Sequence, residues 1–95
     1  MSKYAPTKSI GIDIDGTLLI GGELNEPLIE WAKTKRNEGF DVVLWSARGR
    51  KYAEKVANRH EISDVFTAII GKPGYIVDDL GWQWIKYTKV IRQAF

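Results

Sequence analysis

The sequence predicts one domain, residues 1–95, of the α/β class, with a Rossmann-like arrangement of three layers around a small, mostly parallel sheet. Segments with the pattern of strands alternate along the chain with segments of helical period, which is the order typical of parallel sheets. Polar or acidic residues also follow three of the predicted strands. Ligands bind beyond the carboxyl ends of the strands in such sheets, so the same pattern predicts where a site would lie.

The first predicted strand covers residues 9–14, where isoleucine alternates with small or acidic residues. It ends at Asp15-Gly16, a pair that favours a turn. Leu18-Leu19-Ile20 is then followed by Gly21-Gly22, which predicts a short flap or hairpin before the next helix.

Two amphipathic helices are predicted, at about residues 26–38 and 49–60. Asn25 can cap the first helix, and Gly39 can close it in a left-handed conformation. The side chains at helical spacing in the first helix are Leu28, Trp31, Ala32 and Lys35. Those in the second helix are Tyr52, Ala53, Val56, Ala57 and His60.

The remaining predicted elements are three strands and a closing helix. The apolar run from Phe40 to Trp45 is typical of a strand buried on both faces and is followed by Ser46. Residues 65–70 and 75–77 have the composition of two further short strands. From about residue 82 to 95, helical spacing predicts an amphipathic helix with one face formed by Trp84, Ile85, Thr88, Ile91 and Phe95.

Composition narrows the class of function. The absence of cysteine excludes disulfides, thiolate catalysis and zinc sites built on sulfur. A net charge of +2 does not indicate nucleic acid, although the cluster Arg48, Arg50 and Lys51 can attract a small anion. The chain has neither a long apolar run nor the apolar region of a signal peptide, so we expect a cytoplasmic protein without a membrane partner.

Two pairs of acids are the main candidates for chemistry. Asp13 and Asp15 are separated by one residue at a strand end, so both side chains can lie on one side. Asp78 and Asp79 follow the strand predicted at 75–77. Four carboxylates at one sheet edge repel each other unless a cation neutralises them, and hard oxygen ligands suit magnesium. The alternative is that Asp15-Gly16 and Asp79-Leu80-Gly81 are only turns.

These residues also carry a family resemblance. The stretch Asp13-Ile14-Asp15-Gly16-Thr17-Leu18, preceded by a strand, resembles the first motif of the haloacid dehalogenase superfamily. Ser46, Lys72 and the pair Asp78-Asp79 are similar to its second, third and fourth motifs. Trp45-Ser46-Ala47-Arg48-Gly49 and Gly71-Lys72-Pro73 further resemble its minimal phosphatase-like members, which lack a cap domain.

The resemblance implies a magnesium-dependent phosphomonoester hydrolase. Asp13 would be the nucleophile that forms an aspartyl phosphate, and Asp15 the general acid and base. Magnesium would be held by Asp13, Asp15 and the pair Asp78 and Asp79. Ser46 would donate to a phosphoryl oxygen, unless it caps the following helix, and Lys72 would offset negative charge. The residues expected to bind the substrate are Gly16, Thr17, Ala47 and Arg48.

Two departures from the family leave alternatives open. Only Pro73, Gly74 and Tyr75 separate Lys72 from Ile76, whereas neighbouring parallel strands need a crossover of about a dozen residues. Either residues 65–70 run irregularly, or Lys72 is not the lysine of the third motif. The missing cap would leave the site open, which favours a homodimer or larger homo-oligomer. The partner expected from the resemblance is a small phosphorylated substrate, a sugar phosphate or nucleotide; a protein that only binds such a compound and a phosphotransferase are the alternatives.

Overall fold

The computed structural model describes residues 5–92 and contains a three-stranded parallel sheet. Its strands are β1 (Ser9–Ile12), β4 (Asp41–Ser46) and β5 (Ala68–Gly71), in the order β1-β4-β5. Ser9 pairs with Asp41 in register, and Val43 pairs with Ala68. The predicted α/β class with a mostly parallel sheet is therefore confirmed.

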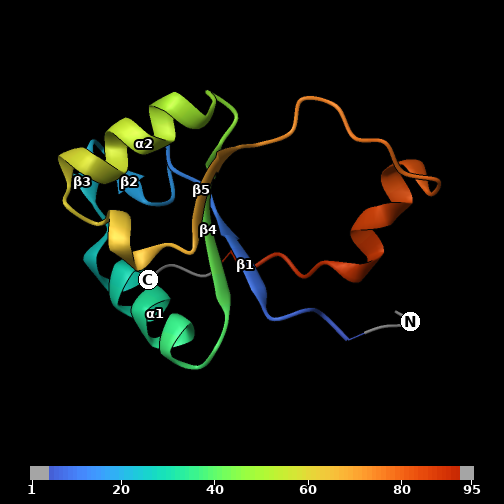
Figure 1. Ribbon diagram of the computed structural model, residues 1–95, viewed down its shortest axis with the longest axis horizontal. Helices are drawn as coiled ribbons and strands as arrows, with labels where there is room; N and C mark the ends of the chain where they lie inside the picture. Colours follow the sequence, from blue (N-terminus) through green and yellow to red (C-terminus); the bar gives the residue numbers. More distant parts are fainter. Residues whose placement is uncertain (1–4, 93–95) are drawn as a thin grey trace.

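Helices connect these strands and lie on one side of the sheet (Figure 1). They are α1 (Glu26–Asn37), α2 (Arg50–Arg59) and the short 3-10 helix η1 (Ser63–Val65). The Asn25 Oδ1 atom accepts a hydrogen bond from the Leu28 N–H at 3.4 Å, so the predicted cap of α1 is present. Because η1 takes the start of the segment predicted as a strand at 65–70, β5 begins only at Ala68.

A two-stranded hairpin lies between β1 and α1, where the sequence predicts a flap. It consists of β2 (Leu19–Ile20) and β3 (Glu23–Leu24). Gly21 and Gly22 form its turn with φ of 60° and 81°, values that favour glycine because they lie in the left-handed region. The Asn25 N–H donates to the Leu18 carbonyl at 2.8 Å, which joins the hairpin to the start of α1.

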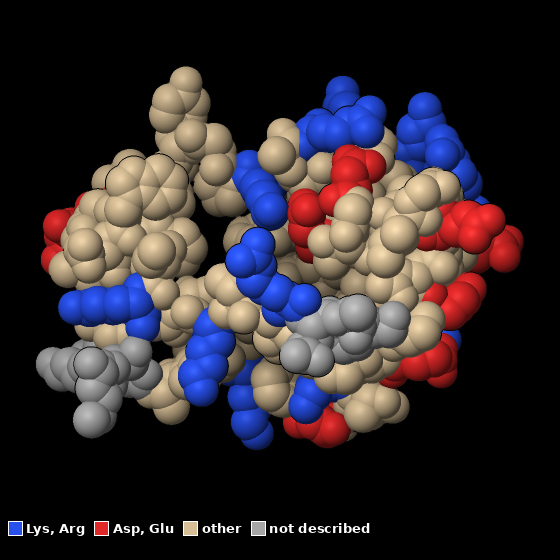
Figure 2. All heavy atoms as spheres, turned by 180° about the vertical axis from the view of Figure 1, so that it is seen from behind, with Lys and Arg blue, Asp and Glu red and all other residues tan. Residues whose placement is uncertain are grey.

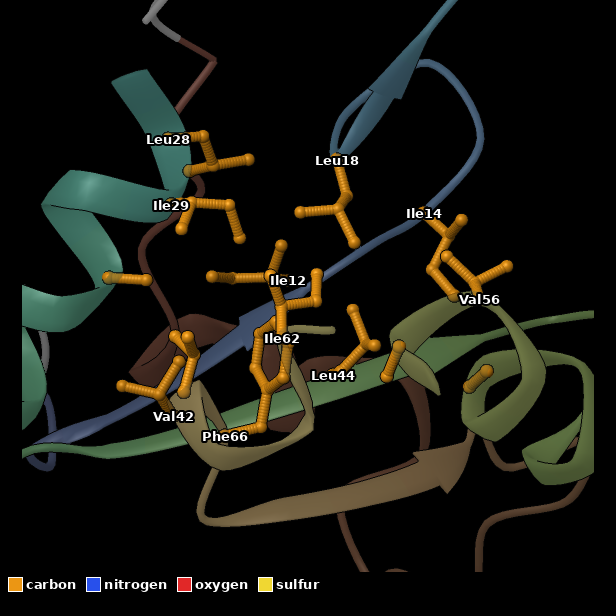
Figure 3. Close-up of a cluster of buried hydrophobic side chains, with 14 of the residues drawn as sticks. Ile12, Ile14, Leu18, Leu28, Ile29, Val42, Leu44, Val56, Ile62 and Phe66 are labelled. Carbon is orange, nitrogen blue, oxygen red and sulfur yellow. The ribbon is translucent and has the colours of Figure 1, made fainter. Parts of the chain in front are cut away.

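The hydrophobic core fills the space between the helices and the adjacent face of the sheet (Figure 3). Along β4, Val42 and Leu44 point into this core, while Val43 and Trp45 lie on the opposite face and are half-buried. The helices contribute their apolar stripes, close to those the sequence predicts: Leu28, Ile29, Ala32, Ala53, Val56 and Ala57.

The expected third layer differs from the prediction. Residues 72–92, the C-terminal segment, leave the end of β5 and form a separate lobe across the sheet from α1 and α2 (Figure 1). Residues 75–77 do not form a strand, because three residues after β5 cannot make the crossover that a further parallel strand needs. The helix predicted at 82–95 is also wrong: the described residues form only a 3-10 helix, η2 (Gly81–Tyr87), and Phe95 lies outside the described residues.

The failure of that helix has a physical reason. A helix in a protein draws most of its stability from packing an apolar face, and none of the residues of η2 is buried. Thr88, Val90 and Ile91 are also β-branched, which lowers helix propensity beyond η2.

Within residues 5–92, no helix combines the length and apolar character needed to cross a membrane.

Candidate active site

Three polar residues meet where the three parallel strands end. Asp13 directly follows β1, Ser46 is the last residue of β4, and Lys72 directly follows β5. The Lys72 N–H donates to the Ser46 carbonyl at 2.9 Å, which fixes the end of β5 against the end of β4. Because parallel strands end at the same sheet edge, the fold brings these three strand ends together, and Lys72, whose place the sequence left open, lies at the same edge as Asp13.

Asp13 and Lys72 form an ion pair. The Lys72 Nζ lies 3.4 Å from the Asp13 Oδ1, and both side chains are 38% exposed. The Lys72 ammonium also lies 5.7 Å from the centre of the Trp45 ring. The short link to Ile76 therefore does not keep Lys72 from Asp13. A pair this accessible to water adds little to stability, but it places a cation beside a carboxylate that faces solvent.

The loop after β1 keeps the carboxylates of Asp13 and Asp15 on the solvent side, because the residues between and beyond them are buried. Ile14 and Leu18 are fully buried, whereas Asp15 is exposed. The Thr17 N–H donates to the Ile14 carbonyl at 3.0 Å, and Gly16 turns the chain with φ of 82°. The alternation predicted for Asp13, Ile14 and Asp15 is therefore present.

Asp15 is held by two residues around the start of α2. The Tyr52 hydroxyl donates to Asp15 Oδ1 at 2.8 Å, and the Arg48 Nη1 lies 3.5 Å from Asp15 Oδ2. The Arg48 guanidinium stacks 3.8 Å from the centre of the Tyr52 ring. The hydrogen bond to the Asp15 carboxylate raises the pKa of Tyr52, since it stabilises the neutral phenol.

Tyr52 is the site residue that sequence reasoning missed. Helical period places it beside Ala53 and Val56 on the apolar face, where a tyrosine is interpreted as a residue that packs in the core. Its hydroxyl instead reaches Asp15, 37 positions earlier in the chain. The residue type itself indicated a polar contact, because a tyrosine hydroxyl that packs against the protein usually forms a hydrogen bond.

Ser46 stabilises the loop between β4 and α2 through a hydrogen bond. It is only 2% exposed, and its Oγ accepts a hydrogen bond from the Arg48 N–H at 3.0 Å. The cap position of α2 is Gly49 and makes no side-chain hydrogen bond, so the alternative of Ser46 as a helix cap is wrong. Gly71 packs tightly here: a Cβ would lie 3.1 Å from the Arg50 nitrogen. Ala47 is exposed in the same turn.

The chain was compared with models of known protein families, with curated proteins and with solved structures, and nothing matched. The family resemblance therefore depends on the motif residues alone.

The second acid pair does not join the first within one chain. In residues 5–92, no group of three or more histidine or acidic side chains gathers in a way that could hold a metal ion. The expected cluster of Asp13, Asp15, Asp78 and Asp79 is therefore not formed. Asp78 instead accepts a hydrogen bond from the Leu80 N–H at 2.8 Å, in a turn. Figure 2 shows acidic atoms at the outer edge of the C-terminal lobe, and Asp78 and Asp79 are the only acids of that segment.

An open groove leads to Asp13. It has a volume of about 760 Å³ and runs along β1 from Thr7 to Asp13, with Thr17 and Lys72 at the Asp13 end. We call it the β1 groove. Leu28 and Trp31 of α1 line it, together with six residues of the C-terminal segment: Trp84, Ile85, Thr88, Val90, Ile91 and Arg92. Figure 2 shows the hollow between the lobe and the rest of the molecule with basic side chains around it.

Proposed function

We propose that this chain hydrolyses phosphomonoesters, with Asp13 as the nucleophile. The observation that carries the proposal is the ion pair of Asp13 with Lys72 at the carboxyl ends of parallel strands, with a second carboxylate two residues later. Lys72 supplies positive charge at the point where a phosphoryl group would approach the carboxylate. Arg48 lies across the same opening and is exposed, so it can turn from Asp15 to a phosphate oxygen.

The proposed reaction has two steps. The Asp13 carboxylate attacks phosphorus, the bond from phosphorus to the ester oxygen breaks, and protonated Asp15 donates its proton to the leaving alcohol. The phosphoryl group then remains on Asp13 as an acyl phosphate. In the second step, water attacks phosphorus while the Asp15 carboxylate takes a proton from it. Inorganic phosphate leaves, and Asp13 is a free carboxylate again.

Tyr52 and Ser46 have positioning roles in this proposal. The Tyr52 hydroxyl holds one oxygen of Asp15 and leaves the carboxylate beside Arg48. Ser46 fixes the Arg48 backbone and so the start of the basic loop. Gly16, Thr17 and Ala47 lie in the turns around the opening and are proposed to contact the phosphate, as the resemblance implies.

The donor set fits one magnesium ion in part. Magnesium in phosphoryl-transfer sites uses one or two carboxylates together with water and substrate phosphate. The Asp13 carboxylate and the Asp15 main-chain carbonyl would supply the protein ligands. When bound, the ion would neutralise charge on the reacting oxygens. Asp78 and Asp79 do not fit this role within one chain.

A binding protein without turnover is the second candidate. Both carboxylate oxygens of Asp15 are engaged, one by Tyr52 and one by Arg48, which favours a carboxylate that stays in place over one that transfers protons. In that case the same pocket would hold a sugar phosphate or nucleotide without cleaving it.

A phosphatase assay separates the two candidates. The panel consists of sugar phosphates, nucleotides and p-nitrophenyl phosphate, each with magnesium and with excess chelator. We expect turnover that needs magnesium and falls at least about a thousandfold in Asp13→Asn, roughly 4 kcal/mol of barrier. Asp41→Asn is the matched control, because Asp41 is exposed at the opposite end of the sheet. Equal turnover in Asp13→Asn and the parent would contradict the covalent mechanism, and binding without turnover would favour the second candidate.

A further inference from the structure

Among residues 5–92, the sheet has an unpaired edge on each of its outer strands, β1 and β5, and the β1 groove runs along the edge of β1. In the order β1-β4-β5, only one side of β1 has a neighbour. The Lys8 carbonyl accepts from the Asp41 N–H at 2.9 Å, so Lys8 bonds toward β4. Because successive residues of a strand bond to opposite sides, the backbone groups of Ser9 and Gly11 lie on the unpaired side. Such an edge is a template for a further strand.

The β1 groove lies along this edge and has the character of a peptide-binding site. Leu28 and Trp31 of α1 line it on the side of the body. Apolar side chains beside an open strand edge fit an extended peptide, which pairs through its backbone.

The C-terminal segment contains a peptide of the right kind. Tyr75, Ile76 and Val77 are aromatic or β-branched, the residue types that favour strands. Tyr75 and Val77 are 96% and 103% exposed, and none of the three lies in a strand. A stretch with strand character is therefore present without a strand to pair with.

This peptide cannot pair in parallel with β1 of its own chain. From Gly71 to Tyr75 the backbone can span at most about 14 Å. A strand beyond β1 lies three strand spacings from β5, about 14 Å across, and begins about 16 Å back along the sheet. The direct distance is therefore about 22 Å. A second copy of the chain has no such restriction.

The surface area indicates how much remains to be covered. The molecule exposes 7137 Å², whereas a compact monomer of its mass exposes about 5,500 Å². The excess of roughly 1,600 Å² exceeds the ~800 Å² that each partner buries in a standard interface. Of the ten large apolar side chains exposed in the described part, eight lie between Tyr75 and Ile91. The radius of gyration of 13.8 Å also exceeds the value of about 12.4 Å for a compact chain of this length.

We propose that two copies of the chain exchange C-terminal segments, so that residues 75–77 of each copy pair in parallel with the free edge of β1 of the other. In the proposed register Tyr75 lies opposite Ser9 and Val77 opposite Gly11, and alternation places both side chains on the sheet face that lacks α1 and α2. Ile76 then enters the groove next to Leu28 and Trp31. The exchange is reciprocal, so both edges close in one symmetric dimer.

The exchange also changes the composition of the active site. This second part of the inference rests on the proposed function, whereas the exchange itself does not. In this register Asp79 of the partner subunit follows the added strand at the same sheet edge as Asp13. The carboxylate that one chain cannot supply then comes from the second copy. Each active site of the dimer would be built from both chains.

Disulfide trapping tests the exchange directly, because the chain has no cysteine of its own. Ser9→Cys and a longer, tagged Tyr75→Cys chain are mixed and oxidised. Neighbouring strands lie about 4.8 Å apart, within the Cα separation that a disulfide allows. We expect a covalent heterodimer on a non-reducing gel. Glu54→Cys, exposed on α2, replaces Ser9→Cys in the control and should give no such product.

Two outcomes would overturn the exchange. One is a heterodimer yield no higher than in the control. The other is a Ser9→Cys/Tyr75→Cys double variant that closes its disulfide within one chain and stays monomeric. Sedimentation checks the result without cysteines: the parent should be a dimer, and Ile76→Asp should sediment near 10.8 kDa with unchanged far-ultraviolet circular dichroism. A parent that stays at 10.8 kDa at high concentration would also contradict the exchange.

Complementation tests the shared site. Asp13→Asn is mixed with the double variant Asp78→Ala/Asp79→Ala after dissociation, each being inactive alone. Half of the reassembled dimers are mixed, and each mixed dimer has one complete site, so about a quarter of the parental turnover should return. If the parent is active and no turnover returns, the acids do not act between copies. An inactive parent contradicts the proposed function, while the disulfide result still decides the exchange.

Discussion

The body of the protein, up to Gly71, and the C-terminal segment after it are both rich in apolar residues, but they bury them very differently. All fifteen buried apolar residues of the described part lie between Ile12 and Phe66. Eight of the ten large apolar side chains that are exposed there lie between Tyr75 and Ile91. The difference comes from geometry, because α1 and α2 return across the sheet and give the body a second layer. Residues 75–77 of the C-terminal segment follow β5 after a link too short to reach a further strand position in the sheet.

The largest effect that distinguishes the two regions concerns stability. Leu44→Ala removes a fully buried side chain from the core and should lower the free energy of unfolding by about 2–5 kcal/mol. The loss should be the same at every protein concentration. Val77→Ala should have an effect within about 0.5 kcal/mol in dilute protein, since Val77 is exposed in one copy. Its effect should grow with concentration as dimers form.

Urea unfolding at two protein concentrations measures both variants. If Val77→Ala destabilised dilute protein as strongly as Leu44→Ala does, the C-terminal segment would be packed within its own chain. A loss for Leu44→Ala that depended on concentration would place the dimer contacts in the body instead.

Lys72 is the first residue of the C-terminal segment, and we expect its substitution to lower turnover. Lys72→Ala leaves the Asp13 carboxylate without its cation, so turnover should fall at least about tenfold, or ~1.4 kcal/mol of barrier. Lys55→Ala, on the exposed face of α2, removes the same charge away from the site and should leave turnover unchanged. A loss below about threefold for Lys72→Ala would exclude this lysine from the chemistry.

The smallest expected effect concerns Tyr52, which belongs to the well-packed body. Its hydrogen bond to Asp15 raises its pKa above the ordinary 10.0, because the neutral phenol is stabilised. The stability from this contact is therefore fully present below pH 10.0 and is lost as the pH rises through the higher pKa.

Asp15→Asn removes the charge that stabilises the phenol and should lower the Tyr52 pKa toward its ordinary value. The measurement is an NMR titration of the tyrosine ring carbons, with Tyr52→Phe to assign the signal. An unchanged Tyr52 titration in Asp15→Asn would show that the two side chains do not interact in solution.

The sequence predicts the body well because its patterns are long and consistent. The helical stripe around Leu28 and Ala32 and the apolar run around Leu44 each require a burial that the fold then provides. Tyr75-Ile76-Val77 has equally clear strand character. A local pattern does not show whether a neighbouring strand can be reached, and here the link from Gly71 is too short.

The site is predictable where it follows strand ends and not where it depends on distant contacts. Asp13 and Lys72 follow predicted strands, and the structure joins them at 3.4 Å. Tyr52 escapes prediction because its partner Asp15 lies 37 positions away. The predicted placement of Asp79 at the site is wrong within one chain for the same reason as the strand predicted at 75–77: the link from Gly71 is too short.

The most direct test of the central claim is detection of a phosphoryl group on Asp13. The parent is mixed with p-nitrophenyl phosphate and magnesium, quenched in acid within the first turnover, and digested for mass spectrometry. We expect a phosphorylated peptide at residue 13 that is labile to hydroxylamine, as an acyl phosphate is, and absent from Asp13→Asn. Release of phosphate by the parent, with Asp13 unmodified at every quench time and Asp13→Asn equally active, would contradict nucleophilic attack by Asp13.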